Sequence, residues 1–167
     1  MKHCIVMGVC GCGKSTIATA MAEQLDAHFV EADDYHSADN IDRMRNNQAL
    51  TDANRWPWLL AVATAVNQRT NGCVISCSAL TFAYRDFLRR HIENPVCFIH
   101  LHGSRDTLLE RMNNREGHFM PATMLDSQLE TLELLQESEV GVQLAIENSV
   151  RELAAAAVEF VQASRLV

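Results

Sequence analysis

Residues 8–15 read GVCGCGKS and match the spacing G-x-x-x-x-G-K-[ST]. In loops with this spacing, backbone N–H groups converge on phosphate oxygens, the lysine reaches the β- and γ-phosphates, and the serine hydroxyl ligates Mg²⁺. An apolar run at 4–8 leads into the loop, and a helix with Ile17, Met21 and Leu25 on one face follows it. This context predicts a phosphate-binding loop at a helix N-terminus. The loop residues are Gly8, Val9, Cys10, Gly11, Cys12, Gly13, Lys14, Ser15 and Thr16.

Two cysteines, Cys10 and Cys12, stand at variable positions of this loop and raise the alternative of a metal or redox site. A zinc site would need further ligands at a spacing that the sequence does not contain, and a disulfide between residues two apart would be strained. The phosphate interpretation is therefore kept. Because a helix N-terminus and Lys14 adjoin these thiols, we expect lowered pKa values and sensitivity to oxidants and alkylating agents.

Composition favours a single domain, residues 1–167, and leaves small anionic ligands possible. The chain is 48% hydrophobic and has a formal net charge of −7, whereas nucleic-acid-binding surfaces are rich in Lys and Arg, so we expect no nucleic-acid partner. The N-terminal stretch MKHCIVMGVC has too few apolar residues for a signal peptide or a membrane span, so we expect a cytoplasmic protein with no membrane partner. The six cysteines are then expected to be reduced.

Apolar runs alternate with helical segments along the chain, which predicts an α/β fold. Continuous runs typical of buried parallel strands occur at 4–8, 28–32, 73–76, 96–101 and 142–147. Ser149 and Glu152 form a capping box for the last helix, and Ser104 begins another that runs to about Asn113. The order predicts a mainly parallel five-stranded sheet flanked by helices, with ligand sites beyond the carboxyl ends of the strands.

The stretch EADDYH, residues 31–36, follows the second predicted strand. Adjacent carboxylates there are consistent with a solvated turn, because Asp is common in turns. Beside a phosphate loop they gain a second interpretation, since phosphoryl transfer needs a carboxylate to orient the attacking hydroxyl. One of Asp33 and Asp34 is the predicted base, and the spacing does not decide which.

Two further segments carry arginines. Arg111 and Arg115 are four residues apart around MNNREGHFM, residues 112–120, and would share a helical face. They predict a flap that brings cations onto a transferring phosphoryl group, with a solvated basic helix end as the alternative. In CSALTFAYRDFLRR, residues 77–90, Arg85 is the candidate to face the cleft.

Taken together, these segments resemble the gluconate kinases, small P-loop sugar-acid kinases related in fold to shikimate and adenylate kinases. The resemblance runs from about residue 4 to residue 133 through GVCGCGKS, DDYH…NIDRM, LTDANRWPWL, CSAL…YRDFLR, FIHLHG and R-x-x-R-x-GHFM…LDSQLETLE. It implies transfer of the γ-phosphate of ATP, with Mg²⁺, to the 6-hydroxyl of D-gluconate. It also implies a small lid at about 111–123 and a homodimer.

The resemblance assigns roles to residues of this sequence. Catalytic roles fall on Lys14, Asp33, Asp34, Arg111 and Arg115, and Ser15 would ligate the metal. Contacts with the hydroxyls and carboxylate of the sugar acid fall on Asp33, His36, Arg43, Arg55, Arg85 and His118. Such a lining suits a polyol with one carboxylate, because Arg pairs a carboxylate bidentately while Asp and His hydrogen-bond hydroxyls.

The sequence departs from the family pattern at several positions. Cys10 and Cys12 replace serines, Glu31 replaces an aspartate, and Thr81 and Phe82 stand where two cations are usual. A proline usual after L-E is replaced by Leu-Leu at 134–135. These departures leave two alternatives open: a kinase for another sugar acid or cyclic acid, and a nucleotide-binding regulatory module with little catalysis.

Overall fold

Strands and helices alternate along the chain in the predicted order. The structure, a computed structural model, describes residues 2–46, 48–114 and 122–164. The strands are β1 (His3–Met7), β2 (His28–Glu31), β3 (Cys73–Ser76), β4 (Val96–His102) and β5 (Gly141–Ala145). The helices are α1 (Lys14–Leu25), a 3₁₀ turn η1 (Ala32–Tyr35), α2 (Ala38–Arg45), α3 (Asp52–Asn67), α4 (Phe82–His91), α5 (Arg105–Asn113), α6 (Ala122–Thr131) and α7 (Val150–Ala163).

The five strands form one sheet in the order β2-β3-β1-β4-β5, and every neighbouring pair is parallel. The predicted parallel α/β fold is therefore confirmed. The early crossovers place β2 and β3 on one side of β1, and the later ones place β4 and β5 on the other. Parallel sheets bind ligands beyond the carboxyl end of the strand where this reversal occurs. The loop at 8–13 follows β1 directly and occupies that position.

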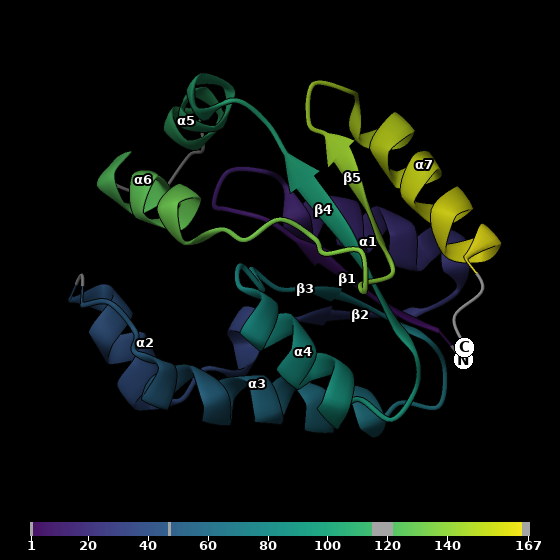
Figure 1. The fold of residues 1–167 in the computed structure, drawn as a ribbon, viewed down its shortest axis with the longest axis horizontal. Helices are drawn as coiled ribbons and strands as arrows, with labels where there is room; N and C mark the ends of the chain where they lie inside the picture. Colours follow the sequence, from purple (N-terminus) through teal and green to yellow (C-terminus); the bar gives the residue numbers. More distant parts are fainter. Residues whose placement is uncertain (1, 47, 115–121, 165–167) are drawn as a thin grey trace.

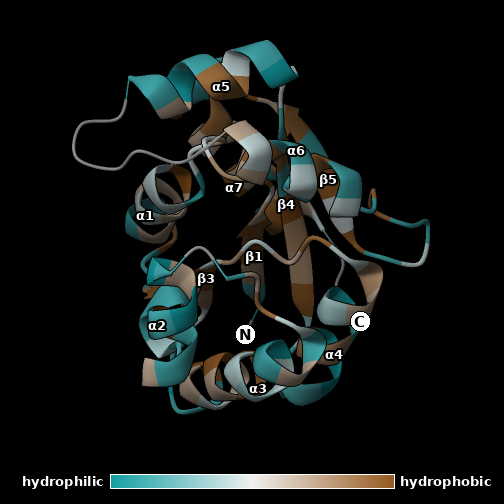
Figure 2. Ribbon diagram, turned by 90° about the vertical axis from the view of Figure 1, so that its left-hand side faces the viewer, coloured by the Kyte–Doolittle hydropathy of each residue, from teal (hydrophilic) through white to brown (hydrophobic). Residues whose placement is uncertain are grey.

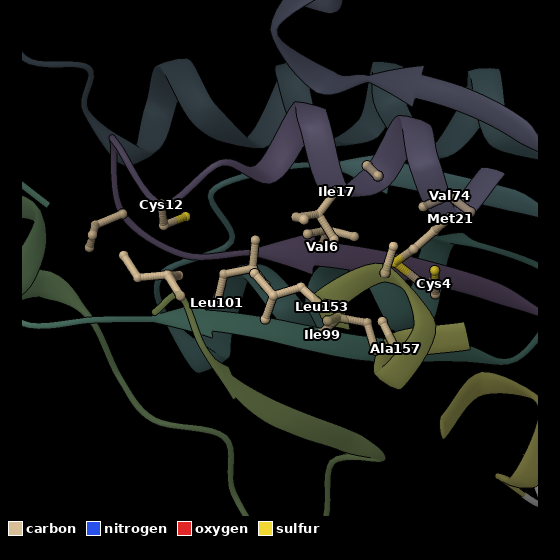
Figure 3. Packing of buried hydrophobic residues seen from close by; sticks show 14 of the residues in the cluster. Cys4, Val6, Cys12, Ile17, Met21, Val74, Ile99, Leu101, Leu153 and Ala157 are labelled. Carbon is tan, nitrogen blue, oxygen red and sulfur yellow. The ribbon is translucent and has the colours of Figure 1, made fainter. Parts of the chain in front are cut away.

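Helices cover both faces of the sheet, with α1 and α7 on one face and α3 and α4 on the other (Figure 1). The central strands β1, β3 and β4 are mostly apolar and buried between these layers, whereas the edge strands β2 and β5 are only partly buried. The outer helix faces are largely hydrophilic (Figure 2). Each fully buried aliphatic side chain contributes about 1.5–3 kcal/mol of transfer free energy. Figure 3 shows the layer between the sheet and α1 and α7, which contains Val6, Ile99, Leu101, Ile17, Met21, Leu153 and Ala157.

The helix caps predicted from sequence are confirmed. The Ser149 hydroxyl accepts from the backbone N–H of Glu152 at 3.3 Å, and the Glu152 carboxylate accepts from the backbone N–H of Ser149 at 2.9 Å. Ser104 caps α5 by accepting from the backbone N–H of Thr107 at 3.1 Å, and α5 ends at Asn113. These side chains satisfy N–H groups that have no partner within their own helix.

The six cysteines all lie in the described part of the chain, where each is buried and free of disulfide bonds. Over the same ranges, no helix combines the length and apolar character that a membrane crossing requires.

Candidate active site

The loop between β1 and α1 has the backbone conformation that its glycines predict. Gly8 and Gly11 have φ angles of +140° and +79°, values that other residues rarely adopt. A Cβ at Gly8 would lie 2.5 Å from the Leu101 carbonyl oxygen, and one at Gly11 would lie 2.9 Å from the Leu108 carbonyl oxygen. The backbone at Gly8 and Gly11 therefore lies too close to β4 and α5 for any residue with a side chain, and the loop packs directly against both elements.

Two polar groups of this loop have partners that belong to the protein itself. The Lys14 ammonium donates to the Val9 carbonyl at 3.0 Å, and the Cys10 backbone N–H donates to the side-chain oxygen of Gln128 in α6 at 2.7 Å. Both are groups that a phosphate would use. A phosphate oxygen that took the Cys10 N–H would have to replace the Gln128 side chain, so α6 is connected directly to the loop.

A cluster of oxygen donors lies at the carboxyl ends of three neighbouring strands. Ser15, at the start of α1, donates to the Glu31 carboxylate at 2.6 Å and lies 3.3 Å from the Ser76 hydroxyl, oxygen to oxygen. Glu31 is the last residue of β2, and Ser76 is the last residue of β3. Mg²⁺ binds oxygen ligands, and typically one or two carboxylates together with phosphates, so this donor set fits it. Thr16, the last residue of the predicted loop set, is exposed in the first turn of α1.

The loop thiols differ from the sequence-based expectation. Cys10 and Cys12 are 8% and 1% exposed, and the Cys10 sulfur lies 3.5 Å from that of Met112 in α5. Burial raises the pKa of the Cys10 thiol, and the charge of Lys14 only partly opposes this effect. The expectation of a lowered pKa at Cys10 is therefore wrong, because the thiol is buried in the core.

The acidic turn η1 presents both predicted carboxylates to solvent. The Asp33 side chain is 79% exposed, and Asp34 is also exposed. The turn is anchored to α3, because the Trp58 indole N–H donates to the Ala32 carbonyl at 2.7 Å. Either carboxylate can therefore accept a proton from a bound hydroxyl, and the choice between them stays open.

Next to this turn, His36 stacks on Trp58 with ring centroids 4.3 Å apart. The nearby Asn40 is buried and donates from its side-chain nitrogen to His36 Nδ1 at 3.3 Å and to the Asn54 carbonyl at 3.2 Å. His36 and the acidic turn are thus brought together as predicted, on a base formed by α2 and α3.

The two other arginines assigned to substrate occupy α2 and α3. Arg55 donates to the Tyr84 hydroxyl at 3.0 Å, and that hydroxyl donates to Asp52 at 2.6 Å. Burial raises the pKa of Tyr84, which keeps its hydroxyl protonated as a donor. Arg43 is half-buried, and its Nε has no hydrogen-bond partner within the described residues. Both arginines therefore retain donors for an anionic ligand.

Arg85 is a correction to the sequence analysis, because its side chain is fully buried and does not face a cleft. Its Nε and Nη2 donate to the two carboxylate oxygens of Glu139 at 2.6 and 2.9 Å. The remaining donors bind the backbone carbonyls of Ala79, Leu80, Glu133 and Leu134. With its donors all used internally, Arg85 holds the segment before β5 against α4.

The predicted flap is only partly described. Arg111 lies in the last turn of α5, where its guanidinium donates to the Ile146 carbonyl after β5. Arg115 and His118 lie outside the described residues. On the far side of that gap, α6 is joined to α5 by a bidentate contact from Arg105 to Asp126, with N–O distances of 2.6 and 3.0 Å.

Sequence reasoning missed several residues of the site. Two of them, Ser76 and Glu31, are the last residues of parallel strands, and this position is the sequence feature that could have identified them. Asn40, Gln128 and Glu139 carry no such signal, because their partners lie on other elements.

This chain is similar in sequence and in fold to known P-loop kinases. The chain matches a family model described as an AAA domain over residues 4–135. It is 42% identical over 147 residues to the gluconokinase of Gluconobacter oxydans, which covers 86% of this chain and 82% of that protein. The crystal structure of a gluconokinase from Sinorhizobium meliloti has a TM-score of 0.89 and 39% identity, covering 96% of this chain and 91% of that one.

A more distant structure, the shikimate kinase of Aquifex aeolicus, has a TM-score of 0.60 at 12% identity and covers 97% of this chain and 96% of that one. It shares the fold. The similarity to gluconokinases extends over most of the chain, so the resemblance noted from sequence is confirmed. The chain therefore belongs to the gluconokinase family of P-loop kinases.

Proposed function

We propose that this protein transfers the γ-phosphate of ATP to the 6-hydroxyl of D-gluconate and releases ADP and 6-phosphogluconate. The observation that carries the proposal is the position of a phosphate loop beside an exposed acidic turn, at the carboxyl ends of β1 and β2, in a member of the gluconokinase family. A nucleotide-binding module would need the loop, but it would not need the exposed carboxylates of η1.

The phosphate side of the site consists of the 8–16 loop and α1. Its backbone N–H groups and Lys14 bind the phosphates, with Lys14 exchanging the Val9 carbonyl for phosphate oxygens. Ser15 and Glu31 would hold Mg²⁺, which supplies charge neutralisation to the phosphates when bound. Ser76 positions the Ser15 hydroxyl from the neighbouring strand.

The acceptor side consists of η1 and the surfaces of α2 and α3. One of Asp33 and Asp34 accepts the proton of the attacking hydroxyl as the oxygen–phosphorus bond forms. Arg43 and Arg55 have donors suited to the gluconate carboxylate, and His36 faces the acidic turn. Arg85 does not bind the substrate, because its side chain is fully buried and its guanidinium is paired with Glu139.

A lid at about 111–123, carrying Arg111, Arg115 and His118, completes the site in a single-domain enzyme of residues 1–167. We propose that it closes over the transferring phosphoryl group, where cations and exclusion of water favour reaction. The assembly proposed for the protein is a homodimer in the cytoplasm. The net charge of −7 supports the absence of a nucleic-acid partner.

The test is ADP formation measured with a panel of sugar acids and cyclic acids at fixed ATP and Mg²⁺. D-gluconate should give the highest kcat/KM. The panel tests specificity because Thr81 and Phe82 stand where the family usually has two cations, which could change the preferred acid. Asp33→Asn and Asp34→Asn, measured side by side, identify the base by the larger loss of kcat. Tight ATP binding with no acceptor-dependent ADP would favour the regulatory module, and a preference for another acid would reassign the substrate.

A further inference from the structure

His36 contacts two buried side chains, Asn40 and Trp58. The His36 side chain is 5% exposed, Asn40 is 3% exposed, and Trp58, which stacks on the imidazole, is 6% exposed. Buried polar groups require hydrogen-bond partners, so the donors and acceptors in this cluster must match. Their matching fixes where the imidazole proton lies.

The orientation of the Asn40 amide follows from its contact with the backbone. The carbonyl of Asn54 can only accept, so the Asn40 atom 3.2 Å from it must be the NH₂ nitrogen. The same nitrogen lies 3.3 Å from His36 Nδ1 and directs its second hydrogen there. Nδ1 must therefore accept, and it carries no proton.

This leaves the imidazole proton on Nε2, which faces the acidic turn. Nε2 lies 3.8 Å from Asp33 Oδ1, beyond direct hydrogen-bond distance. A hydroxyl oxygen about 2.8 Å from both atoms would accept from Nε2–H and donate its own proton to Asp33. A second proton on Nδ1 would meet the NH₂ group of Asn40, so the neutral ring is favoured.

The charges around the ring agree with a neutral imidazole. Burial lowers the pKa of His36, the nearby positive charge of Arg55 lowers it further, and only the carboxylate of Asp33 opposes them. Asn40 on α2 and Trp58 on α3, which also contact the ring, carry no charge.

We propose that Asn40 is a positioning residue that holds His36 in the Nε2–H tautomer, so that His36 donates to a substrate hydroxyl that in turn donates a hydrogen bond to Asp33. The proposal rests on the proposed function and adds to it a fixed direction of hydrogen bonding at the acceptor. His36 orients the lone pairs of this hydroxyl without itself removing a proton.

The direct test is ¹⁵N NMR of the histidine rings in the unmodified protein at pH 7.5, without substrate. The His36 signal, assigned by its loss in His36→Gln, should show an unprotonated Nδ1 and a protonated Nε2. A protonated Nδ1 would overturn the proposal. This measurement needs no turnover, so its result is separate from whether gluconate is the substrate.

The kinetic test compares Asn40→Asp with Asn94→Asp, which adds the same charge on an exposed loop at the amino end of β4. In Asn40→Asp the new carboxylate accepts a hydrogen bond from Nδ1–H, and its negative charge raises the pKa of His36. Above that pKa the neutral ring keeps its proton on Nδ1, so Nε2 has no proton to donate. The kcat/KM for gluconate should then fall about fivefold as pH rises through that raised pKa, as expected for one lost hydrogen bond.

The KM for ATP should not change in Asn40→Asp, and Asn94→Asp should have the pH profile of the parent protein. A profile for Asn40→Asp equal to that of Asn94→Asp would contradict the proposal. If Asn40→Asp does not fold, the ring ¹⁵N shifts of the parent protein still decide it. A correct tautomer in a protein that does not phosphorylate gluconate would refute the proposed function alone.

Discussion

Replacing Glu139 with Gln should destabilise the protein strongly, because Arg85 would be left as a buried charge without a counterion. Both side chains are completely buried, and the carboxylate accepts two charge-assisted bonds from the guanidinium, at 2.6 and 2.9 Å. Removing one partner of such a pair costs about 3–5 kcal/mol. For a domain of this size that free energy lowers the melting temperature by about 6–20 °C.

The assay is urea unfolding followed by circular dichroism, with Asp126→Asn as the matched control. Asp126 pairs with Arg105 through a similar bidentate contact, but on the surface, where ion pairs contribute little to stability. The double variant Arg85→Met, Glu139→Leu should be more stable than Glu139→Gln, because it leaves no buried charge. Equal unfolding midpoints for Glu139→Gln and Asp126→Asn would refute the reasoning.

Three further predictions follow from the loop and the sheet. Gln128→Glu places a carboxylate on the Cys10 N–H and should raise the KM for ATP about tenfold or more, whereas Gln136→Glu, in the segment before β5, should not. Because burial raises the pKa of Cys10, the thiol stays protonated at neutral pH, so iodoacetamide should label it more slowly than a free cysteine in a peptide; faster labelling would contradict its placement. Burial lowers the pKa of His100 to about 4, so the unfolded chain takes up this proton first and stability is lost as pH falls below about 6.5. Between pH 7 and 5 the loss should be about 2 kcal/mol in urea unfolding, and a His100→Leu variant with an unchanged pH dependence would contradict it.

The fold could be predicted from sequence because its determinants are local. The phosphate loop, the apolar runs of the strands and the serine caps at Ser104 and Ser149 each act within a few residues, and the structure confirms them. Small errors occur at strand ends. β2 stops at Glu31 because Ala32 already begins the 3₁₀ turn that carries the acidic pair.

The site was less predictable because its chemistry depends on contacts between distant segments. Arg85 is the cleft candidate of its segment in the sequence, and only the fold brings Glu139 against it from 54 positions away. The thiol of Cys10 is buried, and it contacts Met112, which lies 102 positions along the chain. Asn40 determines the His36 tautomer only after α3 has placed the Asn54 carbonyl beside it.

The most direct test of the central claim is a coupled assay of ADP release by the purified protein with D-gluconate, ATP and Mg²⁺. The proposed function predicts ADP formation that depends on gluconate, yields an equal amount of product phosphorylated at the 6-hydroxyl, and is lost in Lys14→Ala while the folded structure is retained. Folded protein that binds ATP and releases no additional ADP when gluconate is added would contradict it.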